Sequence, residues 1–487
     1  MKKRILTYTS AILLAINITA CDNFLDVTPV DKLLEEQVFT NELGIHNALN
    51  GVYLAMNNRT SYGADLTMTT VEAIAQRYDV ADSRHPFYNY GFLRYTDPSA
   101  VTKFENIWTG AFVNILNINA LLKGLDEYPT VLSPAHEAIV RGEAIGLRAL
   151  LHFDLFRLYG PMPGNNLEDT SLPYYDQVVT EPAPLLSGIQ FLNKVIMDLE
   201  KAESLLSDDP IRSQGVMFSE PDLGGSNFFR YRNYRLNYYA VKALKARTLL
   251  YAGEKSAALE AAQGVIKEAS QWFPWTDPSH ILNRPQAPDR LFSTEIIFGL
   301  QNLQRTNLQR DFFSSELTEL TILAARPSRL TNTFQANEND YRFNSSWVIP
   351  ATKPFRTFFK YAEPIVPGTN DIAARYRYII PMIRKSEMYY IAAEVLAESD
   401  PEQSLELINT VRFNRGLPEL ASGVNLQTEI QREYEKEFYG EGQLFFYYKR
   451  RGITAIPNGS ANSGNRAMST TTYMIPIPLV EFEFRNN

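Results

Sequence analysis

The chain has 487 residues, of which 55 are Asp or Glu and 47 are Lys or Arg, so its formal net charge is −8 at pH 7. This acidic balance argues against a nucleic-acid partner, whose phosphates require a basic face. Hydrophobic residues make up 45% of the chain, which is enough for a folded core. The single cysteine excludes internal disulfides and a zinc ribbon.

The N-terminus has the layout of a secretion signal. Basic residues at positions 2–4 precede an apolar run from Ile5 to Ile18, which is shorter than the roughly 20 apolar residues of a membrane-spanning helix. Ala20 leads directly into Cys21, a junction that resembles a bacterial lipobox, in which the thiol is lipidated and becomes the new N-terminus. The alternative is a buried core cysteine. We predict a signal peptide over residues 1–20, lipid attachment at Cys21 and a lipidated tether over residues 21–36.

Apolar residues at helical spacing recur along the rest of the chain. The clearest helix has Ser133 as its N-cap, Pro134 at its first position and a stop at Gly160-Pro161. A strand is predicted from Glu295. The other predicted helices are Glu42–Met56, Val101–Leu125, one capped by Ser187, pairs that begin at Arg235 and Glu254 and at Lys385 and Asp400, and a last one from about Thr428 to Gly440.

The predicted helix pairs resemble one another. The first helix of a pair carries aromatic residues followed by alanines, as at Tyr238 to Ala240 and at Tyr389 to Ala393, and a short turn leads to a second amphipathic helix. This is the pattern of tetratricopeptide-like repeats, in which stacked helix pairs bury a continuous core. We predict a mainly α fold, an irregular superhelix of such pairs with long inserted loops and a few short strands. It forms one domain over residues 37–487, with insertions near 57–100, 161–186, 207–234 and 270–384.

Reactive motifs are not evident in the sequence. The five histidines lack metal-site spacing, and no nucleophile elbow, P-loop or dinucleotide-binding motif occurs. Glu437 and Glu441 lie at helical spacing, and a glycosidase needs two facing carboxyl groups. We interpret this pair as part of a salt-bridged or solvated helix face. The sequence neither shows nor excludes a catalytic pair of acids.

Seven segments, in order, resemble SusD/RagB-type nutrient-binding outer-membrane lipoproteins of the Bacteroidetes. The resemblance implies four tetratricopeptide-like units with an inserted binding face, no cofactor, and a lipid-anchored position in the outer membrane at the cell surface. It also implies a TonB-dependent transporter (a SusC-like barrel) as partner. The sequence departs from the family at Leu444 and Tyr447, where Arg and Asp are usual. The segments are "CDNFLDVTP", "RGEAIGLRALLHFDLFRLYGPMP", "RLNYYAVKALKARTLLYAGEKSAALEAAQGVI", "IRKSEMYYIAAEVLAE", "LELINTVRFNRGL", "REYEKEFYGEGQLFFYYKRRG" and "YMIPIPLVEFEFRNN".

This resemblance favours a non-catalytic protein that binds a nutrient, mostly an oligosaccharide in this family, and delivers it to the transporter. The alternatives are a surface glycan-cleaving enzyme on a helical scaffold and a lid subunit for a non-glycan nutrient such as a peptide. Sugars present flat apolar faces and a rim of hydroxyl groups, so binding calls for aromatic platforms beside polar groups. We interpret Trp108 as a packing residue. The candidate ligand-binding residues are Arg77, Tyr78, Asp79, Tyr88 and Tyr90 in the 57–100 loop, and Phe312, Phe313 and Trp347 in the 270–384 insertion.

Overall fold

A continuous stack of paired helices forms the scaffold of the protein. The computed structural model describes residues 38–164, 166–218, 226–365 and 372–486, so Cys21 and the tether lie outside the described residues. Each helix of the stack packs against the next, from α3 through to α18. In chain order these helices are α3 (Glu42–Met56), α6 (Pro98–Glu127), α7 (Pro134–Tyr159), α8 (Gly188–Leu205), α10 (Tyr238–Ala252), α11 (Lys255–Ala269), α17 (Lys385–Ser399) and α18 (Pro401–Phe413).

Local signals in the sequence explain where these helices begin. The Ser133 hydroxyl accepts a hydrogen bond from the backbone N–H of His136 at 3.2 Å, and Pro134 occupies the first position of α7. Ser187 caps α8 in a reciprocal capping box with Gln190. The helices predicted to begin after Ser133 and Ser187 are therefore confirmed.

Small residues let the paired helices approach closely. A Cβ atom added at Gly146 of α7 would lie 2.7 Å from a methyl group of Leu236, and Ala240, Ala392 and Ala393 are fully buried. Short side chains at such positions allow neighbouring helices to interdigitate at the density of a protein interior. The structure confirms the predicted fold class, a mainly α superhelix of helix pairs with few short strands.

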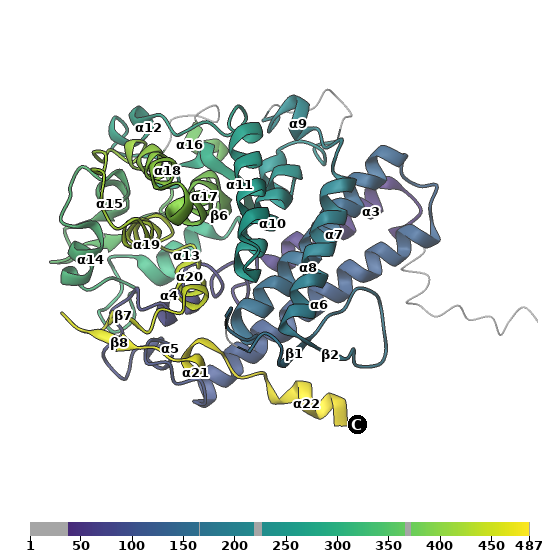
Figure 1. Ribbon diagram of the computed structural model, residues 1–487, viewed down its shortest axis with the longest axis horizontal. Coiled ribbons are helices and arrows are strands. Elements are labelled where there is room, and N and C mark those ends of the chain that lie inside the picture. The colour runs from purple at the N-terminus through teal and green to yellow at the C-terminus, as the bar shows by residue number, and fades with distance from the viewer. Residues whose placement is uncertain (1–37, 165, 219–225, 366–371, 487) are drawn as a thin grey trace, which may run out of the picture.

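The 270–384 insertion lies on one side of the stack (Figure 1). In Figure 1, α6, α7 and α8 lie on the right, α10 and α11 in the middle, and the elements of the 270–384 insertion on the left. The remaining helices, including two 3₁₀ turns, are α4 (Thr70–Ile74), α5 (Tyr88–Gly91), α9 (Ile211–Gln214), η2 (Arg232–Tyr234), α12 (Pro278–Leu282), η3 (Ser293–Glu295), α13 (Arg305–Phe313), α14 (Pro327–Phe334), α15 (Tyr341–Ser346), α16 (Ile372–Arg375), α19 (Leu426–Glu437), α20 (Leu444–Arg451), α21 (Thr470–Tyr473) and α22 (Leu479–Asn486).

The strands form antiparallel pairs. The predicted strand near Glu295 is confirmed as β3, and it pairs with β6, which directly precedes α17 and was not predicted. The other pairs close short hairpins or loops between helices. Within the described residues, the four pairs are β1 (Thr170–Pro173) with β2 (Leu185–Ser187), β3 (Ile296–Gln301) with β6 (Ile379–Arg384), β4 (Trp347–Val348) with β5 (Thr357–Phe358), and β7 (Ala455–Pro457) with β8 (Asn465–Ala467).

A buried network of arginines and carboxylates joins the insertion to the helix stack. Arg415 donates to Glu437 at 2.6 Å and to Glu295 at 2.6 Å, and Arg384 lies between Glu437 and Glu441. Burial raises the pKa of Glu437, but Arg415 and Arg384 outweigh it and hold that pKa well below its usual value. The full network consists of Glu295, Asp340, Arg342, Lys360, Arg384, Arg412, Arg415, Glu433, Lys436, Glu437 and Glu441.

Two further sequence features lie in the core. Leu444 and Tyr447, which replace the family's usual Arg and Asp, are both buried, and the Tyr447 ring stacks on Tyr434 with centroids 4.3 Å apart. At positions 444 and 447, apolar and aromatic packing therefore takes the place of the charged residues usual in the family. Trp108 is also buried, with its ring edge-to-face against Tyr159 at 5.0 Å, as predicted for a packing residue. None of the helices in the described part of the chain is both long and apolar enough to cross a membrane.

Candidate ligand-binding site

Two adjacent hollows flank the segment that follows α4. The Arg77 hollow has a volume of about 200 Å³ and is lined by Ala75, Gln76, Arg77, Ala325, Arg329, Leu330, Asn332, Thr333, Glu435, Tyr439, Tyr448 and Pro457. The Asp79 hollow has a volume of about 320 Å³ and is lined by Asp79, Ala81, Asp82, His85, Glu319, Leu320, Ile322, Ala324, Ala325, Arg326, Pro327 and Phe355. Ala325 lines both, so the two hollows adjoin.

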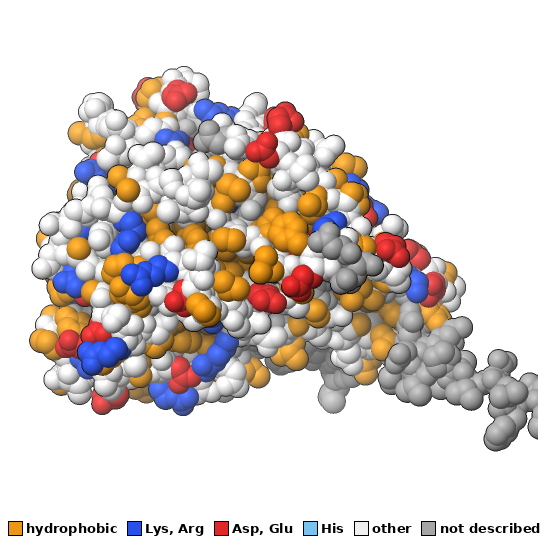
Figure 2. Space-filling view, turned by 90° about the horizontal axis from the view of Figure 1, so that it is seen from below, with side chains coloured by type: hydrophobic (Ala, Val, Ile, Leu, Met, Phe, Trp, Pro, Cys, Tyr) orange, Lys and Arg blue, Asp and Glu red, His pale blue; other side chains and the backbone are white. Residues whose placement is uncertain are grey.

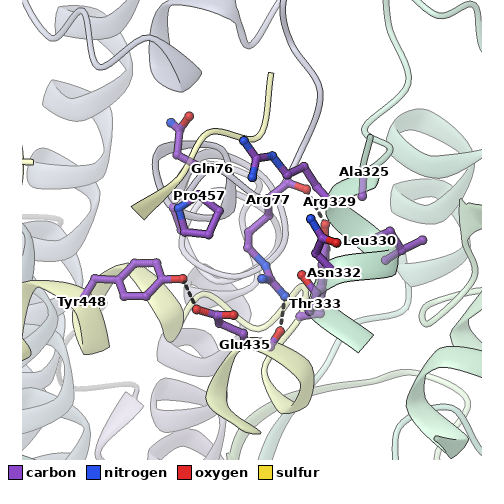
Figure 3. Close-up of a pocket in the computed structure, with 12 residues that line it drawn as sticks. Gln76, Arg77, Ala325, Arg329, Leu330, Asn332, Thr333, Glu435, Tyr448 and Pro457 are labelled. Atoms are coloured by element: carbon purple, nitrogen blue, oxygen red, sulfur yellow. Dashed lines mark hydrogen bonds between the residues drawn. The ribbon is translucent and has the colours of Figure 1, made fainter. Parts of the chain in front are cut away.

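Several polar side chains in the Arg77 hollow can form hydrogen bonds with the hydroxyl groups of a ligand. Figure 3 shows the Arg77 side chain in the centre, with Asn332 and Thr333 of α14 on one side and Glu435 of α19 below. The Glu435 carboxylate accepts a hydrogen bond from the Tyr448 hydroxyl at 2.8 Å, and the Arg77 guanidinium lies 3.6 Å from the centroid of the Tyr439 ring. Amide, hydroxyl, carboxylate and guanidinium groups therefore converge on one concave surface.

The Asp79 hollow combines an ion pair with apolar lining. Asp79 lies 2.8 Å from Arg326, which also donates to Asn462 at 3.2 Å. Phe355 and Leu320 supply partly exposed apolar surface on its wall. A ring beside charged, hydrogen-bonding groups is the arrangement expected of a sugar subsite.

Hydrogen bonds from distant parts of the chain hold the 76–80 segment in place. The Asp79 N–H donates to the Ala324 carbonyl at 2.8 Å, and the Val80 N–H donates to the Ser460 hydroxyl at 3.1 Å. Gln76 adopts a left-handed backbone conformation with φ +62°. A Cβ atom added at Gly459 would lie 2.3 Å from the Gln76 carbonyl oxygen, so only glycine permits this approach.

A buried acid supports the floor of the same segment. Glu72 of α4 accepts hydrogen bonds from the backbone N–H groups of Gly440 at 3.1 Å and Gly442 at 2.9 Å, and it lies 3.6 Å from Arg77. Burial raises the pKa of Glu72 to about 7, although Arg77 and the two N–H groups favour its ionised form. The contact between Glu72 and Arg77 orients the Arg77 side chain where it enters the hollow.

A stack of aromatic rings and arginines extends the site toward α5. The rings of Tyr88 and Phe92 stack with centroids 4.3 Å apart. Arg94 lies 4.9 Å from the Tyr88 ring, and Arg466 of β8 lies 4.8 Å from the Phe92 ring while donating to Gln76 at 2.9 Å. Because Gln76 lines the Arg77 hollow, this stack is continuous with it.

The predicted site residues divide into two groups in the structure. Arg77 and Asp79 line the two hollows, and Tyr88 is partly exposed at the edge of the aromatic stack. Phe312 is half-buried beneath Arg59, at 5.7 Å. Their role in ligand binding stays a prediction.

The other four predicted residues lie in the core. Trp347 is 0% exposed and packs on Phe358 and Tyr439; Phe313 is 0% and Tyr78 is 1% exposed. Tyr90 is 6% exposed, and its hydroxyl donates to the Ser99 carbonyl. A ring without an exposed face cannot stack on a sugar, so the structure corrects the predicted ligand-facing role of Tyr78, Tyr90, Phe313 and Trp347.

Several lining residues were missed in the sequence analysis. Arg329, Asn332, Thr333 and Glu435 belong to α14 and α19, more than 200 residues along the chain from Arg77. No local pattern marks them, because only the tertiary fold brings these helices to the 76–80 segment. Phe355 lies in the insertion that was predicted to contribute aromatic residues, although Trp347 was named in its place.

The two acids singled out in the sequence have structural partners. Glu437 is bound by Arg342, Arg384 and Arg415, and Glu441 by Lys360 and Arg384, all buried. The salt-bridged interpretation of this pair is confirmed. Among the described residues, no group of three or more His, Cys, Asp and Glu side chains is arranged to hold a metal ion.

Comparison with solved structures shows the fold. A SusD superfamily protein from Bacteroides thetaiotaomicron is 20% identical and has a TM-score of 0.67, covering 91% of this chain and 98% of its own. A surface glycan-binding protein from the same species, solved in complex with laminarihexaose, is 16% identical and has a TM-score of 0.65, with the same coverage of both chains.

Sequence comparison gives the family. Residues 23–219 match the family described as "Starch-binding associating with outer membrane", and residues 332–475 match the SusD family. A SusD-like protein of Formosa agariphila is 23% identical over 475 residues, which cover 87% of this chain and 84% of that protein. The two family matches together span more than half of the sequence, the fold agrees over nearly its whole length, and the chain belongs to the SusD/RagB family.

Proposed function

We propose that this protein is a non-catalytic binding lipoprotein that captures an oligosaccharide in the two hollows beside residues 76–79. The observation that carries the proposal is the convergence of Arg77, Asn332, Thr333 and Glu435 on one hollow, with the Tyr88–Phe92 stack at its edge. Polar groups can satisfy sugar hydroxyls there, and the partly exposed rings can cover apolar sugar faces. Relatives with the same fold include a protein bound to laminarihexaose and a laminarin-binding SusD-like protein.

Delivery to a TonB-dependent transporter is the second part of the proposal. It rests on membership of the SusD/RagB family, one branch of which is described as associating with the outer membrane. Mild-detergent pull-down of the tagged protein from its native membrane should recover a large β-barrel protein. Repeated recovery of the protein alone would count against the partner.

Lipid anchoring at Cys21 would hold the protein on the outer membrane, at the cell surface. The proposal retains residues 1–20 as the signal peptide, 21–36 as the tether and 37–487 as one domain, on the signal-like layout of the N-terminus. Expression with labelled palmitate should label the wild type and leave Cys21→Ala unlabelled. Equal label in both would contradict the assignment.

A panel of oligosaccharides tests the binding function and separates it from the alternatives. Purified protein without its signal peptide should bind at least one oligosaccharide and release no new reducing ends during prolonged incubation. New reducing ends would favour a glycan-cleaving enzyme. Binding of peptides with no binding of any glycan would favour a lid subunit for a peptide nutrient.

A further inference from the structure

The edge of the proposed site carries arginines that have no carboxylate partner. Arg94, Arg329 and Arg466 form no ion pair with any described Asp or Glu, whereas buried arginines such as Arg342 and Arg415 are each paired with two or more carboxylates. The protein as a whole is acidic, with a formal charge of −8. An uncompensated group of cations on an otherwise acidic protein attracts anionic partners.

Contacts link these three side chains into a row along the β7–β8 hairpin. Arg329 donates to the carbonyls of Ala461, at 2.8 Å, and Gly464, both in the turn between β7 and β8. Arg466 follows on β8, bound to Gln76 and stacked on Phe92. Arg94 lies over Tyr88 and Phe92 at the far end of the row. We call Arg94, Arg329 and Arg466 the arginine row.

The row continues into a third hollow beside α21. This hollow has a volume of about 400 Å³ and is lined by Leu93, Arg94, Tyr95, Thr96, Asp97, Thr471 and Pro476. Figure 2 shows the face that carries β7, β8, α5 and α21, and Lys and Arg side chains lie mainly over its left half, the side of β7 and β8 in Figure 1. A chain-like ligand that starts in the Arg77 hollow can therefore follow the row.

Each arginine is held in place by neutral groups, which leaves its charge available. Rings and backbone carbonyls carry no net charge, so they orient the guanidinium groups of the row without neutralising them. The Arg94 guanidinium donates to no protein atom among the described residues. Arg329 is bound by backbone carbonyls and forms no ion pair with a described Asp or Glu, and burial and the nearby Arg326 lower its pKa.

Of four acids near the row, two are paired with other arginines and two accept hydrogen bonds only from neutral groups. Asp79 is paired with Arg326 and Asp82 with Arg84, while Asp97 caps α6 by accepting from Ser99. Glu435 accepts from Tyr448 and Gln431 and lies across the Arg77 hollow from Arg329 (Figure 3). The three arginines of the row therefore outnumber the two acids beside them, Asp97 and Glu435, that keep an unpaired charge.

We propose that the ligand is an anionic oligosaccharide, bearing sulfate esters or uronate carboxylates, whose charged groups bind the arginine row while its sugar rings occupy the hollows. The inference rests on the proposed glycan-binding function and deepens it. Guanidinium groups match sulfate and carboxylate oxygens with paired N–H donors, so planar arginines held by stacking suit both substituents.

The test compares three oligosaccharides of equal length by calorimetry: neutral laminarihexaose, a hexagalacturonate with carboxylates only, and a sulfated galactan hexasaccharide. We expect at least one anionic hexasaccharide to bind about tenfold or more tighter than laminarihexaose. Raising NaCl from about 0.05 to 0.5 M should weaken that binding several-fold, because salt screens exposed charges. The anionic hexasaccharide that binds tighter identifies the substituent.

Variants localise the effect to the row. Arg94→Gln and Arg466→Gln should each weaken binding of the anionic ligand about fivefold more than they weaken binding of laminarihexaose, because only the anionic ligand loses a charge partner as well as a contact. The matched control is Arg212→Gln, because Arg212 is also an exposed arginine stacked on a tyrosine, Tyr238 at 4.4 Å, but belongs to α9 at the opposite edge of Figure 1. It should leave both affinities unchanged.

The outcomes separate this inference from the proposed function. Equal affinity for neutral and anionic hexasaccharides, or no loss in the row variants, overturns the anionic assignment and leaves glycan binding intact. Failure to bind any glycan, neutral or anionic, overturns the proposed function and with it the inference. Binding to phosphatidylglycerol vesicles with no preference for the anionic hexasaccharides would assign the row to a membrane surface and also overturn the inference.

Discussion

The buried network around Glu437 and the arginine row on the surface use the same residue type in opposite ways. In the network, Arg342, Arg384 and Arg415 are fully enclosed, and each lies between carboxylates. In the row, Arg94 and Arg466 lie on aromatic rings and have no carboxylate partner among the described residues.

The difference distinguishes arginines that stabilise the fold from arginines whose charge is available to a ligand. Burying a charge is costly unless it is paired or hydrogen-bonded, and the network arginines are paired with acids. A surface arginine needs no such partner, and where it is held by rings and carbonyls its charge remains free for a ligand. Stability should therefore depend on the network and affinity on the row.

The largest expected effect follows from breaking the network. Glu437→Gln removes the charge that Arg342, Arg384 and Arg415 share, so each of these buried arginines loses one of its carboxylate partners and the network gains net positive charge. The free energy of unfolding should fall by about 3–5 kcal/mol. Denaturant unfolding measures the change, and Glu398→Gln on the exposed part of α17 is the control, with an expected loss below about 0.5 kcal/mol. A small effect at Glu437 would mean that the network is not a structural unit.

Replacing a buried aromatic residue should reduce stability, as breaking the network does, and should not act through ligand affinity. Trp347→Ala removes a fully buried side chain packed on Phe358 and Tyr439, and truncation of a buried Trp typically costs about 3–5 kcal/mol of stability. Thermal and denaturant unfolding check the result. A Trp347→Ala variant as stable as the wild type that loses ligand affinity would restore the original ligand-facing assignment of this residue.

The pH dependence of stability tests a buried base, His152, that forms no ion pair with a described Asp or Glu. Burial lowers the pKa of His152 to about 3, and its ring accepts from the Tyr175 N–H at 3.1 Å while donating to the Arg148 carbonyl at 2.9 Å. Between pH 6.5 and 5 the unfolded chain binds a proton that the folded ring does not, so stability falls as pH falls.

His152 alone should contribute at most about 1.4 kcal/mol per pH unit to this slope. Unfolding free energies of the wild type and His152→Asn at pH 6.5 and 5 measure it. The variant should show a shallower slope, whatever its absolute stability. Equal slopes would show that the imidazole is not held neutral.

The smallest expected effect belongs to the aromatic stack. Tyr88→Ala removes a ring that is partly exposed and contacts Phe92 and Arg94, so it should weaken binding of the cognate oligosaccharide by about tenfold, near 1.4 kcal/mol. The melting temperature should change little. Calorimetric titration and thermal unfolding of one preparation give the affinity and the melting temperature. A large loss of stability with unchanged affinity would show that Tyr88 supports the fold and does not bind the ligand.

The sequence predicted the helical scaffold because its signals are local. Ser133 and Ser187 cap helices within a few residues, and alanines at helical spacing mark the close contacts of α10 and α17. The last predicted helix, from about Thr428 to Gly440, is α19 (Leu426–Glu437), and the next turns form α20 (Leu444–Arg451), which was not predicted. The run of aromatic residues there is buried on several sides and so lacks a one-sided pattern.

The candidate site was predictable only in part. The 57–100 loop and the 270–384 insertion do supply lining residues, including Arg77, Asp79 and Phe355. Trp347 pairs with Phe358 across β4 and β5, and this contact turns its ring into the core. The spacing of residues in the sequence does not specify such contacts, so it could not show which aromatic residues face solvent. Glu433 and Glu437 hold α19 in the buried network, and this position brings Glu435, on the same helix, to the Arg77 hollow. The sequence could not show this placement because it depends on contacts between distant parts of the chain.

Hydrogen–deuterium exchange with and without a bound oligosaccharide tests the central claim most directly. Ligand in the two hollows and along the row should protect backbone amides of residues 76–95, 319–333 and 455–466, which carry the lining residues and their supports. The exposed surfaces of α8, α11 and α18 should exchange at unchanged rates. Protection confined to those helices, with none in the three segments, would contradict the assignment of the binding site.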